Sequence, residues 1–526
     1  MTDQTSESTQ TNGRKLLGAS GSVGGLTMLS RIFGLIRDVV LAQVLGAVAA
    51  ADAFFVAFRI PNFFRRLFAE GAFNIAFVPV LIDYRQNRDH LEVRKLVNRT
   101  AGVLGSTLLV FTLIVVAGSP VVATIFAPGF RLDPEKFELA SHMIRITFPY
   151  LLFISLTGMA GAILNAYDRF AAPAFTPVLL NVCLISGAVI GQLWFDETAV
   201  VLAWAVPVAG VVQLSFQLPF LARIHLLPWP ELGWRDPGVR RILKLMAPAV
   251  IGASVYQINL LFDTLIASLL PTGSVSWLYY SDRLSELPLG VFGIAIATVI
   301  LPSLSRQRFS DDPRLFSSTL DWANKVILLV GLPASVALII LALPILTTLF
   351  MYGEMRPLDV RMSAASLQAY ALGLVAFMLI KVLATGYFSR EDTRTPIRIG
   401  IIAMIANMGM NVVFVLIFYN FWSMGHVGLA LATSLSAFLN LGLLYKGLRK
   451  TNSYQPEAGW LVFVAKLVAA LLVMVLAIVI SSPEQQSWIE WSAWRRVGCL
   501  FWVCVLGAAS YFGTLFLLGM RPKDLH

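Results

Sequence analysis

Charged side chains interrupt stretches of this sequence that are otherwise apolar enough to cross a membrane. Residues 30–42, SRIFGLIRDVVLA, carry Arg31, Arg37 and Asp38 among aliphatic residues, and residues 59–70, RIPNFFRRLFAE, carry three arginines and a glutamate. A charge at the bilayer centre costs several kcal/mol, so such residues are rare unless they face a polar interior. The two stretches therefore predict a polar cavity within the membrane.

A third charged group occurs in the second half of the chain. Residues 274–304 are mostly apolar but contain Asp282, Arg283 and Glu286, and Pro288 follows as a predicted break in the helix. Asp282 and Glu286 are four residues apart and so share one helix face. We predict that this helix lines the same polar cavity as the two earlier stretches.

Arginine in such a cavity favours an anionic ligand, above all a phosphate. The guanidinium fork binds phosphate oxygens bidentately and does not lose its charge. The polar residues predicted to bind the ligand are Ser30, Arg31, Arg37, Asn62, Arg65, Arg66 and Arg283. The acids predicted to hold the arginines in place, or to close salt bridges in the absence of substrate, are Asp38, Asp52, Glu70, Asp282 and Glu286. The alternative is structural: ion pairs that fix helix register, or arginines that extend to the membrane surface.

A second set of polar residues lies within apolar spans of both halves: Asp263, Asn407, Asn411 and Thr433. Carboxylate, amide and hydroxyl oxygens suit a hard cation such as Na⁺. Hydrogen bonding between helices is the alternative role. No other cofactor is predicted, because the 3 cysteines lie in apolar runs and the 5 histidines form no metal-ligand pattern.

The composition places these charges in a membrane protein. Of the 526 residues, 57% are hydrophobic and only 13% are charged, whereas a soluble domain is nearer half apolar and a quarter charged. The net charge of +10 does not indicate nucleic-acid binding here, because basic residues hold the cytoplasmic loops of membrane proteins inside the cell. The predicted fold class is an all-α, polytopic membrane protein.

Apolar stretches of about 20 residues predict about fourteen transmembrane helices. Basic residues gather in alternate loops, which places both termini in the cytoplasm by the positive-inside rule. The predicted spans are 22–48, 51–83, 100–123, 142–166, 173–195, 199–222, 243–270, 274–304, 322–350, 364–389, 395–419, 425–446, 458–481 and 494–519.

The two halves of the chain resemble each other at an offset of about 224 residues, as in transporters built from repeats. For example, IAFVPVLIDYRQ (75–86) matches IATVILPSLSRQ (296–307). Six helices per repeat give two parallel lobes with a cleft between them. The predicted divisions are a polar cytoplasmic tail at 1–20, an N-terminal lobe at 21–225, a C-terminal lobe at 226–450, and a lipid-facing helix pair with a short cytoplasmic tail at 451–526.

Three segments resemble the MurJ (MviN) family of lipid II flippases, which belongs to the MOP exporter superfamily. They are SRIFGLIRDVVLAQVLGAVAAADAFFVAFRIPNFFRRLFAEGAFNIAFVPVL (30–81), ILNAYDRFAAPAFTPVLLN (163–181) and GSVSWLYYSDRLSELPLGVFGIAIATVILPSLS (273–305). The resemblance runs from about residue 20 to the C-terminus. It implies two six-helix lobes and two extra C-terminal helices, in agreement with the span count.

The resemblance also implies a substrate and a location. The substrate is lipid II, the undecaprenyl-diphosphate-linked disaccharide pentapeptide, moved from the inner to the outer leaflet of the bacterial plasma (inner) membrane. The cavity arginines of the family fall on Arg31, Arg37, Arg65 and Arg283. Some members hold Na⁺ in the C-terminal lobe, and the residues here that resemble that site are Asp263, Asn407, Asn411 and Thr433. Membrane lipids and the peptidoglycan synthesis machinery are the other expected partners.

Three other functions remain open from the residues alone. A related exporter would move another oligosaccharide-lipid or cationic drugs, although a drug exporter should have an acidic, aromatic cavity. A membrane glycosyltransferase would bind lipid diphosphates too, but no catalytic or metal motif is present in the short loops. A scaffold of cell-wall synthesis would need no transport. The predicted activity is transport, without enzymatic chemistry.

Overall fold

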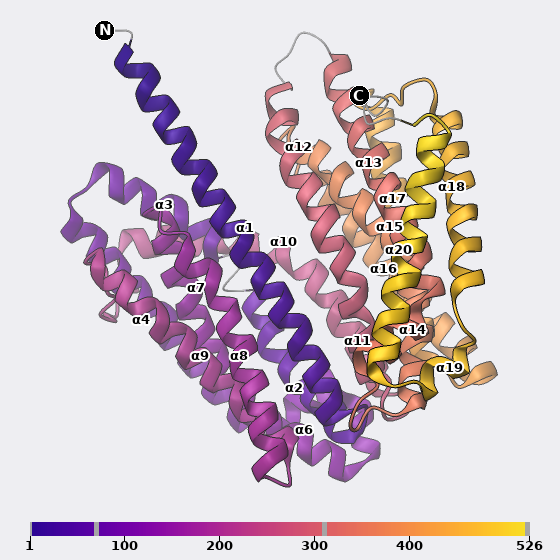
Figure 1. Cartoon of the computed structure of the whole chain (residues 1–526). Helices are drawn as coiled ribbons and strands as arrows, with labels where there is room; N and C mark the ends of the chain where they lie inside the picture. Colours follow the sequence, from indigo (N-terminus) through magenta and orange to yellow (C-terminus); the bar gives the residue numbers. More distant parts are fainter. Residues whose placement is uncertain (1–2, 68–72, 308–312, 521–526) are drawn as a thin grey trace. The chain divides into compact units, whose positions relative to one another are not determined.

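The computed structural model describes residues 3–67, 73–307 and 313–520, and every regular element in them is helical (Figure 1). The chain divides into two compact units, Met1–Leu269 and Leu270–His526. This division groups residues 226–269 with the first unit, whereas the repeat assigns them to the second lobe. The lobe boundary inferred from the repeat stays a prediction.

The first unit is built from ten α-helices and a short 3-10 turn in its described residues. Helices α8 and α9 form its most extensive pair, and α1 packs along α8. The elements are α1 (Asp3–Leu45), α2 (Ala49–Phe64), α3 (Asn74–Asn87), α4 (His90–Ala117), α5 (Ser119–Phe126), η2 (Pro128–Leu132), α6 (Pro134–Thr147), α7 (Tyr150–Ala166), α8 (Ala171–Trp194), α9 (Thr198–Arg223) and α10 (Pro237–Ser268).

The second unit is organised around α15, which packs against α11, α13 and α17. The elements are α11 (Ser274–Pro288), η3 (Leu289–Gly293), α12 (Ile294–Gln307), α13 (Pro313–Ile340), α14 (Ala342–Phe350), α15 (Pro357–Phe388), α16 (Arg394–Trp422), α17 (Gly425–Lys450), α18 (Trp460–Ser481), α19 (Gln485–Glu490) and α20 (Ala493–Leu517).

The prediction of an all-α, polytopic membrane protein is confirmed. In the described residues, 11 helices are long and apolar enough to cross a membrane. The other three predicted spans, at 22–48, 51–83 and 243–270, coincide with α1, with α2 and α3, and with α10. The exact number of fourteen spans stays a prediction.

Two of the charged helices are interrupted by π-type turns. The predicted span at 51–83 forms two helices, with a π-type turn beginning at Arg65, three residues after Asn62. In the second unit, the π-helical segment η3 follows Pro288, where the sequence predicts a break. Interruptions of this kind are frequent at functional sites, because they re-aim side chains within a helix.

A buried carboxylate attaches the start of the C-terminal helix pair to the rest of the second unit. Asp321 on α13 is fully buried and accepts hydrogen bonds from the Tyr454 hydroxyl at 2.7 Å and the Trp460 indole at 2.8 Å. Its second oxygen lies 2.9 Å from the Lys325 ammonium. Burial, together with the bond to Asp321, raises the pKa of Tyr454, so this hydroxyl stays a donor at physiological pH. The start of α18 is thereby attached to α13.

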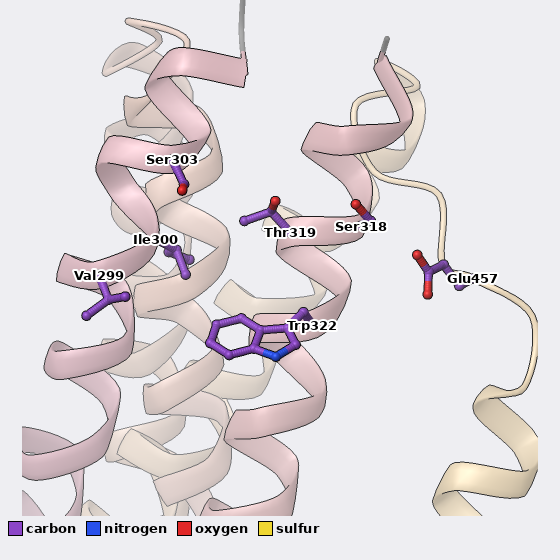
Figure 2. Close-up of a pocket in the computed structure, with 7 residues that line it drawn as sticks. All are labelled: Val299, Ile300, Ser303, Ser318, Thr319, Trp322 and Glu457. Carbon is purple, nitrogen blue, oxygen red and sulfur yellow. The ribbon is translucent and has the colours of Figure 1, made fainter. Parts of the chain in front are cut away.

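Beside this attachment lies a cavity of about 340 Å³ between α12 and α13 (Figure 2). Trp322 and Thr319 point into it from α13, across from Val299 and Ile300 on α12. The hydroxyls of Ser318 and Thr319 donate to the backbone of their own helix. Its polar groups are therefore largely satisfied within the protein.

Replacing Tyr454 with phenylalanine should lower the free energy of unfolding by about 1–2 kcal/mol, because a hydrogen bond to a buried carboxylate is lost. The measurement is the thermal unfolding midpoint of the purified protein in one detergent. Tyr445→Phe is the matched control, because that residue is 41% exposed. Equal midpoints for the two variants would show that the Tyr454 bond contributes nothing to stability.

Candidate substrate-binding site

Arg37 on α1 lies in a buried network that joins α1 to α8. Its Nε and Nη2 donate to one oxygen of Asp38 at 3.0 and 2.7 Å, and its Nη1 donates to the side-chain oxygen of Asn181 at 3.0 Å. The amide nitrogen of Asn181 donates in turn to the Ser30 carbonyl at 3.1 Å. Arg37 and Asp38 are 8% and 3% exposed. The guanidinium is therefore held from two sides in a region shielded from water.

Asn181 is a site residue that the sequence analysis missed. It is buried on α8 and spans two turns of α1, from the Ser30 carbonyl to the Arg37 side chain. The available signal was a single asparagine in the otherwise apolar segment PVLLNVCLI. A buried amide needs hydrogen-bond partners, so an isolated asparagine in an apolar span indicates a polar neighbour on another helix.

Arg31 lies about two turns before Arg37 on α1 and is partly buried. In the part of the chain that the structure describes, its side chain forms no hydrogen bond or ion pair. A partly buried arginine without an acidic partner has its full charge available to an anion. The Arg31 side chain is thus available to bind a ligand, whereas Arg37 is already bonded to Asp38 and Asn181.

The three arginines on α2 and in the turn that follows it differ in their contacts. Arg59 donates to the Thr264 hydroxyl on α10 at 2.6 Å, which ties α2 to α10. Asn62 donates to the carbonyl of Phe58 within its own helix at 2.7 Å. Arg65 and Arg66 are partly buried at the π-type turn. Glu70, predicted to hold them in place, lies outside the described residues.

Asp52 near the start of α2 forms a buried ion pair with a residue that the sequence analysis did not single out. The Lys136 ammonium on α6 lies 2.8 Å from the Asp52 carboxylate, and the two side chains are 5% and 1% exposed. The same ammonium lies 4.3 Å from the centre of the Phe130 ring. Asp52 therefore contributes to the packing of α2 on α6.

The charged residues of α11 lie in the second unit. Arg283 donates to Glu286 at 3.0 Å, one turn along the helix, and its guanidinium lies 5.1 Å from the centre of the Tyr279 ring. The side chains of this ion pair are 32% and 41% exposed. Asp282 is partly buried on the same helix. Both partners of the pair are thus accessible to a ligand.

The residues of the predicted Na⁺ site are divided between the units. Asp263 belongs to α10 in the first unit, and the other three belong to α16 and α17 in the second. Asn411 donates to the side-chain oxygen of Asn407 at 3.0 Å, and Asn407 donates to Ser436 at 3.3 Å. The Thr433 hydroxyl donates within its own helix at 3.0 Å. These bonds join α16 to α17, and the Na⁺ site itself stays a prediction.

Comparison with known proteins finds the same family over most of the chain. The family model described as lipid II flippase MurJ matches residues 41–497. A relative from Vibrio cholerae, named a probable lipid II flippase MurJ, is 49% identical over 519 residues, which cover 97% of this chain and 98% of that protein. Sequence identity this high over nearly the whole of both chains shows common family membership, beyond a shared fold.

Solved structures show the same fold. The lipid II flippase MurJ in an inward closed conformation matches with a TM-score of 0.77 at 24% identity, over 94% of this chain and 99% of that chain. An inward-facing multidrug MATE transporter of the MOP superfamily matches with a TM-score of 0.63 at 16% identity, over 82% and 98%. The chain belongs to the MurJ family of lipid II flippases.

Proposed function

We propose that the protein translocates lipid II, the undecaprenyl-diphosphate-linked peptidoglycan precursor, from the inner to the outer leaflet by alternating access. The observation that carries the proposal is the buried network of Arg37, Asp38 and Asn181 on α1 and α8. A buried arginine is costly within a membrane, so it needs a function. A transporter of a diphosphate provides that function, because the arginine can bind the phosphate groups, whereas a passive scaffold does not. The family membership is the second support.

The residues act by binding and release, and no bond is made or broken. Asp38 offers one oxygen to two N–H groups of Arg37, whereas a diphosphate offers several oxygens and a higher charge. A diphosphate group therefore competes with Asp38 for the guanidinium, and Arg31 supplies a second positive charge on the same helix. Arg65, Arg66 and Arg283 have the same predicted role. When the substrate leaves, Arg37 forms its ion pair with Asp38 again, and Arg283 forms its ion pair with Glu286.

The test is depletion of the protein in cells, followed by a leaflet-accessibility assay for lipid II. We expect lipid II to accumulate in the inner leaflet and to disappear from the outer one. Purified protein in liposomes should move lipid II without consuming it. Unchanged outer-leaflet lipid II on depletion, with peptidoglycan synthesis still lost, would favour a scaffold instead.

The location and partners form part of the same proposal. The chain is a multi-pass membrane protein, and we place it in the bacterial inner membrane with both termini in the cytoplasm, where lipid II is made available. The basic residues of alternate loops support this orientation. Contact with the peptidoglycan synthesis machinery would deliver lipid II to its consumer.

If Asn407 and Asn411 contribute to a Na⁺ site, Na⁺ should stabilise the folded protein by mass action. We expect the thermal unfolding midpoint in NaCl to exceed that in KCl at equal ionic strength. Asn411→Leu should abolish the difference, because it removes an amide oxygen. A wild-type midpoint that is identical in the two salts would leave only the hydrogen-bonding role of these amides.

A further inference from the structure

A cavity of about 320 Å³ lies in the first unit where the turn after α7 meets the C-terminal end of α9. We call it the turn pocket. It is lined by Asp168, Arg169, Phe170, Ala171, Ala172, Phe220 and Arg223. The helix ends that form it bound three of the candidate membrane spans, so the pocket lies at a membrane surface. The loop charges predict that this surface is the cytoplasmic one.

The turn that carries the pocket has a defined conformation. Asp168 adopts the left-handed backbone conformation, with φ of 59°. The Arg169 N–H donates to the Leu164 carbonyl at 2.9 Å, which caps α7. The guanidinium of Arg85 on α3 lies 4.4 Å from the centre of the Tyr167 ring. The pocket is therefore formed before a ligand arrives, which lowers the entropic cost of binding.

Two arginines of the turn pocket present available N–H groups. In the described part of the chain, the Arg169 side chain has no hydrogen bond or ion pair. The guanidinium of Arg223 lies 5.6 Å from the centre of the Phe220 ring. Such a contact uses the face of the guanidinium and leaves the N–H groups in its plane available to an acceptor. The cavity of Figure 2 differs, because its hydroxyls of Ser318 and Thr319 are already bonded to their own helix.

The pocket also contains a negative charge. Asp168 is exposed at its rim and forms no ion pair with any cation in the described residues. Two guanidinium groups and one carboxylate match a ligand that carries both a phosphate and an ammonium group. A purely anionic headgroup would be repelled by the Asp168 carboxylate.

An aromatic row continues from the pocket into the membrane span. The ring centres of Phe220 and Phe216 on α9 are 5.4 Å apart, and those of Phe216 and Phe175 on α8 are 5.5 Å apart. Phe216 precedes Arg223 by seven residues, which places it about 10 Å deeper along the helix. All three rings are partly buried. Such a row suits an acyl chain and distinguishes a lipid from a free phosphate compound.

We propose that the turn pocket binds an amine-bearing phospholipid of the phosphatidylethanolamine class. The phosphate lies between Arg169 and Arg223, the ammonium group contacts Asp168, and one acyl chain follows Phe220 and Phe216. This site is separate from the network around Arg37. The bound lipid would hold the α7–α8 turn against the end of α9.

The test is native mass spectrometry of the detergent-purified, full-length protein with dioleoyl-phosphatidylethanolamine, and with dioleoyl-phosphatidylglycerol as the comparison lipid. Arg169→Gln with Arg223→Gln should weaken phosphatidylethanolamine binding by about tenfold or more, as expected for the loss of charge-assisted hydrogen bonds. Asp168→Asn should reduce the preference for phosphatidylethanolamine over phosphatidylglycerol, since asparagine tolerates the left-handed backbone. Arg235→Gln, an exposed arginine outside the pocket, is the matched control and should bind as wild type.

Three outcomes would overturn the proposal. One is equal phosphatidylethanolamine binding by wild type and the double arginine variant. Another is an unchanged lipid preference in Asp168→Asn. The third is binding of chain-free phosphoethanolamine as tightly as the lipid, which would assign the site to a soluble phosphate compound. No lipid II is added in this assay, so its result does not depend on whether the protein translocates lipid II. Unchanged melting of each variant without lipid verifies that it is folded.

Discussion

Arg37→Ala should reduce lipid II translocation by about a hundredfold, the equivalent of about 3 kcal/mol for the loss of two charge-assisted hydrogen bonds. The guanidinium is buried between Asp38 and Asn181. A cation at the protein surface therefore cannot substitute for it. The measurement is translocation in liposomes at equal protein content. Arg37→Lys should recover only a small part of the activity, because an ammonium lacks the planar fork.

A structural role of Arg37 must be separated from a binding role. Arg37→Ala alone leaves the buried Asp38 carboxylate without the two bonds from Arg37, which lowers stability as well as activity. The double variant Arg37→Ala with Asp38→Asn removes that buried charge and should recover folded protein. If translocation remains low in the double variant, Arg37 acts on the substrate. Recovery of both folding and translocation would contradict the binding role.

The position of the guanidinium can be tested through Asn181. Asn181→Asp retains an oxygen for Arg37 but loses the amide donor to the Ser30 carbonyl, and Asn181→Leu loses both bonds. We expect translocation to fall in the order wild type, Asn181→Asp, Asn181→Leu. Equal activity of the leucine variant would show that Asp38 alone positions Arg37.

Lys136→Met should destabilise the first unit by about 3–5 kcal/mol, because it leaves the Asp52 carboxylate buried without this cation. The two side chains are 5% and 1% exposed, so water does not replace the lost partner. Asp52→Asn should have an effect of similar size for the same reason. The measurement is the thermal unfolding midpoint in detergent, with Lys95→Met as a control whose ion pair with Glu92 is 43% and 42% exposed.

The double variant Asp52→Asn with Lys136→Met provides the decisive comparison. Methionine has nearly the volume of lysine and still contacts the Phe130 ring, so the double variant removes both charges and retains the packing. It should be much more stable than the sum of the single effects predicts. Additive effects would show that the ion pair does not couple α2 to α6.

The class of this protein and the helices that carry its charges could be predicted from the order of its residues alone. Hydropathy identifies membrane helices because about 20 apolar residues are needed to cross the bilayer, whatever the helix packs against. The clusters around Arg31, Arg65 and Arg283 were visible for the same reason, since any charge in such a span needs an explanation. Local chemistry also predicted the break after Pro288, which the structure shows as η3.

The partners of those charged residues became known only from the packing of the helices against one another. Arg37 bonds Asn181 at a separation of 144 residues, Asp52 bonds Lys136 at 84, and Arg59 bonds Thr264 at 205. Periodicity shows which face a side chain occupies on its own helix, but it carries no information about the helix that packs against that face. Lys136 and Asn181 were overlooked because each is a single polar residue, and a single residue becomes part of a site only when folding brings its partner beside it.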